Sequence, residues 1–150
     1  MSRFVYFVAL LIFCSQSAAE NFCDKAYWDD ASVIEEEKCR KSAELGNSEA
    51  QFGYGLILLS GHNRVSKPNE AFEWINNSAK QGNHFAQTLL GRMLSDSRFG
   101  ITLNLPEAYA WWAVSNNLKS ANELWLRLTL EQQQLAKELE KKYALFNSSK

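Results

Sequence analysis

Residues 42–58 read SAELGNSEAQFGYGLIL, and residues 78–94 read SAKQGNHFAQTLLGRML. A shift of 36 residues aligns these two stretches with eight identities in 17 positions. A shift of 37 residues then aligns EAFEW at residues 70–74 with EAYAW at residues 107–111. A period of this length is typical of stacked two-helix repeats, because one helical hairpin cannot bury its own apolar face.

Each repeat unit predicts two helices joined by a loop. In the first unit, Asn47 caps a helix over about residues 48–60, and Gly61 ends it. Pro68 lies in the first turn of the second helix, where its missing N–H does no harm. The same plan sets the two units at about residues 47–82 and 83–118.

Small residues and tryptophans recur where the predicted helices pack together. Small side chains let helix backbones approach closely, and tryptophans fill the remaining volume. The residues with this structural role are Gly46, Ala50, Gly55, Ala71, Trp74, Gly82, Ala86, Gly91, Ala108 and Trp111. The expected fold is therefore an all-α, short α-solenoid of helical hairpins.

These motifs resemble Sel-1-like repeats (SLR). Residues 43–55 and 81–91 match the junction between such repeats, and EAFEW and EAYAW match their second-helix signature. The resemblance covers roughly residues 41–119. Sel-1-like arrays are similar to tetratricopeptide arrays, so the resemblance implies a right-handed stack that acts as a binding platform. Exported bacterial members of the family often have cell-envelope or host-interaction roles.

The flanks of the array depart from the repeat. Residues 24–40 match the second-helix pattern poorly and are expected to form an N-terminal cap, and the Ala and Gly of the earlier junctions are missing at residues 116–119. A C-terminal cap is expected over about residues 120–146, with a disordered tail at residues 147–150. The cap would begin with a capping box and carry an apolar stripe of Leu135, Leu139, Tyr143 and Phe146.

Residues 1–19 predict a signal peptide. Arg3 precedes an apolar run at residues 4–13, and small residues at Ser17 and Ala19 favour cleavage after Ala19. Ten apolar residues are too few for a membrane-spanning helix, which needs roughly 20. The protein is therefore expected to be exported, periplasmic or secreted, with a folded region over residues 20–146 and no membrane span. An uncleaved membrane anchor is the alternative.

Cleavage would leave two cysteines, Cys23 and Cys39. A pair of cysteines in an exported chain predicts one disulfide. On one straight helix their Cα atoms would lie about 24 Å apart, whereas a disulfide tolerates only about 4.4–6.8 Å. A disulfide thus requires a chain reversal, expected near residues 29–32, and two unpaired thiols on one long helix are the alternative.

Charge and motifs exclude several classes of function. The chain has a net charge of −1, or −2 once residues 1–19 are removed, which disfavours nucleic-acid binding. His62 and His84 lie far apart, and there is no CxxC, HExxH or G-x-S-x-G motif. The glutamates at residues 35–37 diverge around a helix instead of converging in a cleft. No metal, cofactor or catalytic residue is expected.

Candidate partner-binding residues come mainly from the first helices, which line the inner face in tetratricopeptide-like stacks. These candidates are Gln51, Phe52, Gln87 and Arg92. The alternative for each is an exposed polar position without a partner role. Trp112 is a further candidate because Trp111 already holds the register of Trp74; burial of Trp112 against the terminal helix is the alternative.

The sequence thus predicts an exported, non-catalytic module that binds a protein or peptide of the cell envelope as a scaffold or adaptor. A regulator or inhibitor of an envelope protein is a narrower form of this prediction. The alternative is an envelope hydrolase that acts on peptidoglycan or related glycans, which would require two converging carboxylates in a cleft.

Overall fold

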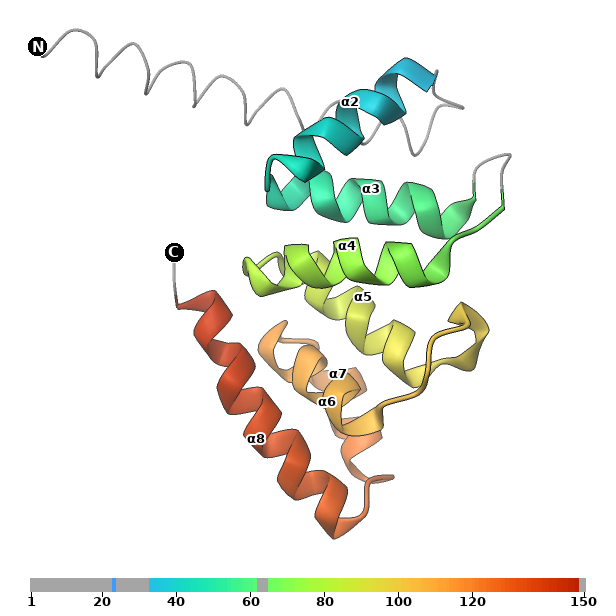
Figure 1. Ribbon diagram of the computed structural model, residues 1–150. Helices are drawn as coiled ribbons and strands as arrows, with labels where there is room; N and C mark the ends of the chain where they lie inside the picture. The colour runs from blue at the N-terminus through green and yellow to red at the C-terminus, as the bar shows by residue number, and fades with distance from the viewer. Residues whose placement is uncertain (1–22, 24–32, 62–64, 149–150) are drawn as a thin grey trace, which may run out of the picture.

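A computed structural model describes residues 23, 33–61 and 65–148 of the chain. Within these residues the secondary structure is helical throughout, as the sequence predicts, and the helices follow one another down a single stack (Figure 1). Their bounds are α2 (Val33–Glu44), α3 (Ser48–Ser60), α4 (Pro68–Lys80), α5 (His84–Ser95), a 3-10 turn η1 (Ser97–Phe99), α6 (Leu105–Val114), α7 (Leu118–Trp125) and α8 (Leu130–Asn147). The predicted signal peptide, the predicted reversal at residues 29–32 and His62 lie outside the described residues.

Successive helices from α2 to α6 pack against one another, so the core is distributed along the stack. Helix α8 departs from this order because it packs mainly against α6 and reaches back to the edge of α4 (Figure 1). The fold is therefore an all-α solenoid of hairpins with a final helix laid across its end.

Asparagine caps set the start of the first helix in each hairpin. The side chain of Asn47 accepts a hydrogen bond from the Ala50 N–H, and that of Asn83 accepts from the N–H groups of Phe85 and Ala86. Such caps satisfy backbone donors that the first turn leaves free. They explain why α3 has the predicted bounds.

The repeat junction also recurs at residues 116–117, where the sequence predicts that the array degenerates. Asn116 adopts a left-handed backbone conformation, with φ 60°, at the position that Gly46 and Gly82 occupy in the earlier junctions. Asn117 then caps α7 by accepting from the Ser120 N–H. The prediction was wrong because asparagine, like glycine, tolerates the left-handed region.

Small residues determine how closely the helices approach. A Cβ atom added at Gly55 would lie 2.6 Å from Ile75 Cγ1, and one added at Gly91 would lie 2.5 Å from the Trp112 ring. Ala71 and Ala108 are fully buried between neighbouring helices. Trp74 fills space beside Tyr54, with their ring centroids 5.6 Å apart.

The N-terminal end of the stack is closed by the Cys23–Cys39 disulfide, whose Cα atoms lie 5.1 Å apart. Both cysteines are buried, and Cys23 packs on Gly53 of α3, where an added Cβ would come within 2.5 Å of the Cys23 Cβ. Cys23 and Cys39 are joined by a disulfide, so the structure does not have the two unpaired thiols on one long helix that the alternative required.

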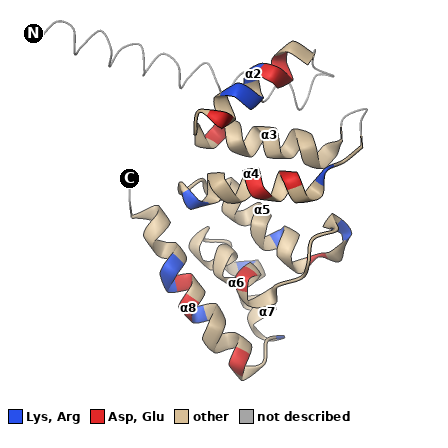
Figure 2. Cartoon of the chain, in the orientation of Figure 1, with Lys and Arg blue, Asp and Glu red and all other residues tan. Residues whose placement is uncertain are grey.

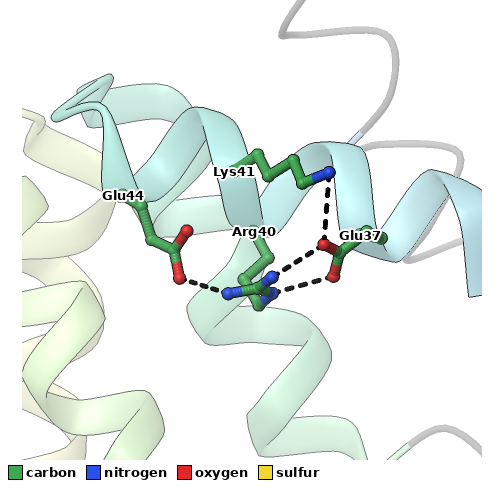
Figure 3. Close-up of polar contacts among 4 residues, drawn as sticks. All are labelled: Glu37, Arg40, Lys41 and Glu44. Carbon is green, nitrogen blue, oxygen red and sulfur yellow. Dashed lines mark hydrogen bonds and ion pairs between the residues drawn. The ribbon is translucent and has the colours of Figure 1, made fainter.

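Ion pairs link charged side chains along α2 (Figure 3). Arg40 donates to Glu37 at 2.7 Å and also pairs with Glu44, and Lys41 lies 3.5 Å from Glu37. The hydrogen bond from Arg40 lowers the pKa of the Glu37 carboxyl. These side chains are solvent-accessible, and charges of both signs are interspersed along the stack (Figure 2).

Helix α8 closes the C-terminal end with aromatic side chains. Trp111 of α6 stacks on Tyr143 with ring centroids 4.1 Å apart, and Phe146 extends the stack. Thr129 and Gln132 form the expected capping box. Leu135, predicted to belong to the apolar stripe, is 47% exposed, whereas Ala136 is buried. Leu139, Tyr143 and Phe146 lie on the packed face as predicted, so the apolar stripe differs only at its N-terminal end, where Ala136 is buried in place of Leu135.

The end of α8 corrects the predicted tail. The helix continues to Asn147, and the Asn147 side chain accepts from Gln87 at 2.8 Å and donates to the Val114 carbonyl at 2.9 Å. Residue 147 is therefore part of the folded structure, since it bridges two other helices.

Candidate functional site

The surface of the stack carries a hollow of about 610 Å³. Residues of α3 and α5 line it together with the turn between α6 and α7. We call it the first-helix groove, and its lining residues are Phe52, Leu56, His84, Phe85, Thr88, Leu89, Arg92, Ser115, Asn116 and Asn117.

Aromatic and aliphatic side chains make up much of the groove lining. Phe52 and Phe85 stack with ring centroids 6.3 Å apart, and the His84 ring lies 4.4 Å from that of Phe85. Phe85 is 62% exposed although it sits on a well-capped helix. A large aromatic ring is thus presented to solvent by rigid backbone, which is a property of recognition sites.

The two ends of the groove are polar and differ in charge. Arg92 lies at one end, exposed, with its guanidinium 5.8 Å from the centroid of the Phe99 ring. Asn116 and Asn117 lie at the other end, in the turn before α7. Because first helices all begin at the same edge of the stack, His84 shares this second end.

Phe52 and Arg92 are the predicted partner-binding residues that the structure brings together in the groove. Their partner role stays a prediction. Phe85, Leu56 and Leu89 were not singled out from the sequence. A signal for Phe85 existed, because the 36-residue shift pairs it with Glu49, so an aromatic ring stands where the other repeat has an exposed charge.

Gln51 and Gln87 do not line the groove; Gln51 is 6% exposed and Gln87 is 0% exposed. Gln51 Nε2 donates to the Ala43 carbonyl at 3.2 Å, and Gln87 Nε2 donates to the Ala79 carbonyl at 3.1 Å. Each glutamine therefore ties a first helix to the end of the preceding second helix. Gln51 and Gln87 therefore have a structural role in place of the predicted partner contact, because a buried amide requires hydrogen-bond partners of this kind.

Trp112 fits neither of its two sequence-based interpretations. It is half-buried against α5, where its ring covers Gly91 and its Nε1 donates to the Thr88 carbonyl at 3.1 Å. Trp111, not Trp112, packs on the terminal helix. Trp112 thus contacts the groove through its hydrogen bond to Thr88, which is one of the groove residues.

The described residues hold no cluster of three or more His, Cys, Asp or Glu side chains that could bind a metal ion. Two of their carboxyl groups have displaced pKa values, and both are lowered. Arg40 lowers the pKa of Glu37, and hydrogen bonds from Arg98 lower the pKa of Asp96 to about 2. A general acid needs the opposite displacement.

Comparison with known proteins identifies the architecture. No protein-family model matches the chain, and no curated protein matches it. A crystal structure of a protective antigen present in uropathogenic Escherichia coli strains, which displays an SLR fold, matches with a TM-score of 0.77 and 26% sequence identity. The match covers 88% of this chain and 30% of the antigen, so this chain spans less than a third of that protein's length.

The helices described above therefore form an SLR fold, which confirms the resemblance that the sequence motifs indicate. A search of the described helices for a segment with the length and hydropathy of a membrane span finds none.

Proposed function

We propose that this chain with an SLR fold is an exported, non-catalytic module that binds a protein or peptide segment in the first-helix groove. The observation that carries the proposal is Phe85, a 62% exposed aromatic ring in the lining of a largely apolar hollow. Leaving such a ring in water is unfavourable, so a partner that covers it gains burial energy.

Shape and composition of the groove support a macromolecular partner. The groove is built from helices that are fixed by buried glutamines and asparagine caps, so little of its order has to be created on binding. A few aromatic and arginine anchors commonly supply most of the affinity at such surfaces. Phe52, Phe85 and Arg92 are residues of these types.

Export is part of the proposal. The predicted signal peptide at residues 1–19 would direct the chain to the cell envelope and be removed after Ala19. A Cys23–Cys39 disulfide is suited to an oxidising compartment outside the cytoplasm. The similar E. coli protein is described as a protective antigen, which is compatible with a location accessible to antibodies.

The proposal is tested by capture from an envelope extract with the full chain, followed by mass spectrometry. We expect Phe85→Asp to reduce recovery of the captured protein by more than tenfold, because it places a charge among the apolar side chains of the groove. Leu135→Asp is the matched control, since Leu135 is also an exposed apolar side chain but lies on α8. Equal recovery with Phe85→Asp and wild type, both folded by circular dichroism, would contradict the proposal.

A further inference from the structure

We propose that the first-helix groove takes an extended peptide segment whose acidic side chain pairs with Arg92, about three residues away from an apolar side chain that packs on Phe85. This inference rests on the proposed function and specifies the chemistry of its partner. It follows from the charge of the groove, from the surroundings of Arg92 and from the spacing of the two anchors.

The groove has an uncompensated positive end. Among the described residues that line it, none is acidic, and Arg92 is the one that carries a permanent charge. The Arg92 guanidinium forms no ion pair with any described residue. A carboxylate of a partner would therefore meet a cation that forms no ion pair within the described part of the chain, where the nearby Asp96 carboxylate feels its charge only at longer range.

The acidic residue nearest to Arg92 in the sequence already forms an ion pair with another arginine. Asp96, four residues along the chain, accepts from Arg98 Nε at 3.0 Å and from Arg98 Nη2 at 2.6 Å. This bidentate arrangement uses both carboxylate oxygens of Asp96. Arg92 is consequently left available at the mouth of the groove.

The wall beside Arg92 favours pairing with a carboxylate. The half-buried Phe99 ring lies 5.8 Å from the guanidinium carbon and shields one side of the group from water. An ion pair gains strength where part of its hydration is replaced by apolar surface. Arginine also presents a planar fork of donors that a carboxylate can bind with both oxygens.

The spacing of Phe85 and Arg92 sets a register. The two residues are seven positions apart on α5, which corresponds to about 10 Å along the helix axis. An extended peptide rises about 3.3 Å per residue, so about three residues of it span this distance. At the far end of the groove, the side chain of Asn116 is exposed and can bond to peptide backbone.

The experiment is a selection of a random seven-residue peptide library on the immobilised full chain. We expect enriched peptides to carry Asp or Glu about three positions from an aromatic or aliphatic residue. A synthetic copy of an enriched peptide should lose about tenfold or more in affinity when its acid is changed to the matching amide, and a similar loss is expected with Arg92→Gln. Selection on Arg92→Glu should instead enrich Lys or Arg at that position.

Arg127→Glu is the control, because Arg127 is exposed outside the groove. Peptides that bind through Phe85 but show neither an acid preference nor a dependence on Arg92 would overturn this inference and leave the proposed function standing. Absence of any enrichment, or binding that Phe85→Asp does not affect, would overturn both.

Discussion

The two ends of the stack are closed in different ways. At the N-terminal end, the Cys23–Cys39 disulfide joins α2 to Cys23, which packs on Gly53 of α3. At the C-terminal end, no covalent bond is involved, and Trp111 of α6 stacks on Tyr143 of α8. Every solenoid must cover the exposed faces of its terminal repeats, so both ends solve the same problem.

The apolar content of each terminal helix explains the difference. Helix α2 buries only Cys39 and Ala43, both small, and its other residues apart from Ser42 are charged or exposed. Burial of so little apolar surface supplies little free energy. Helix α8 instead brings Tyr143 and Phe146 against a fully enclosed tryptophan. A covalent bond at one end thus replaces the packing that the other end has.

The largest effect should come from the C-terminal end. Trp111→Ala removes a side chain that is 1% exposed and leaves a cavity between α6 and α8, which should lower the free energy of unfolding by about 3–5 kcal/mol. Urea denaturation followed by circular dichroism measures this loss. Trp112→Ala is the control, with a smaller expected loss because Trp112 is half-buried. An equal loss in both variants would show that the aromatic stack does not hold α8.

The disulfide should matter somewhat less. Replacing Cys23 and Cys39 together by serine removes a cross-link between two residues that are 16 positions apart in the sequence. The free energy of unfolding should fall by about 3 kcal/mol. Hydrogen exchange should locate the increased opening in α2, while α6 and α8 keep their protection. Protection lost evenly along the stack would mean that the two ends are not independent. Two free thiols at these positions in the purified protein would refute the disulfide itself.

Gly53→Ala separates packing on the disulfide from helix propensity. In the oxidised protein the new Cβ would lie 2.5 Å from the Cys23 Cβ, so a loss of about 1–3 kcal/mol is expected from overpacking. In a Cys39→Ser background Cys23 is free to move, and the substitution should become stabilising by up to about 1 kcal/mol, because alanine favours helix over glycine. A double-mutant cycle measures whether the effect of Gly53→Ala on the free energy of unfolding changes sign between the two backgrounds. The same sign in both backgrounds would contradict the close packing of Cys23 on α3.

The helices of the repeat could be predicted because their signals are local. Asn47, Gly61 and Pro68 each act on the backbone within one turn, so they determine where α3 begins and ends and where α4 begins. The 36-residue period then identifies equivalent positions. Both features are independent of how the hairpins finally pack.

The orientation of individual side chains could not be predicted in this way. A period pairs Gln51 with Gln87 but does not say that both amides reach the carbonyls of the preceding helix. The exposure of Leu135 beside the buried Ala136 depends on how α8 packs on α6, where Tyr143 stacks on Trp111, and no local pattern encodes this packing. The groove could be predicted only in part: the pairing of Phe85 with Glu49 marks an exposed position, but no local pattern shows which side chains line one hollow together.

The smallest predicted effect concerns pH and again distinguishes the two ends. Burial, followed by the charge of Glu107 and a hydrogen bond to it, raises the pKa of Tyr143 well above its ordinary value of 10. Below pH 10 the phenol is protonated in the folded and the unfolded chain, so its contribution to stability is fully present. Above pH 10 the unfolded chain releases this proton first, and stability should fall with rising pH by about 1 kcal/mol at pH 11.

Tyr143→Phe should flatten this alkaline fall, although it removes the 2.9 Å hydrogen bond to Glu107 and so costs about 1 kcal/mol at neutral pH. Urea denaturation at pH 9, 10 and 11 gives the slope for each variant. The Cys23→Ser, Cys39→Ser variant is the matched control from the other end, where stability should drop at every pH while the slope stays that of wild type. If the slope changes in that control and not in Tyr143→Phe, the alkaline sensitivity belongs to the N-terminal end. Tyr54, whose pKa is also raised by burial, would then be the group responsible.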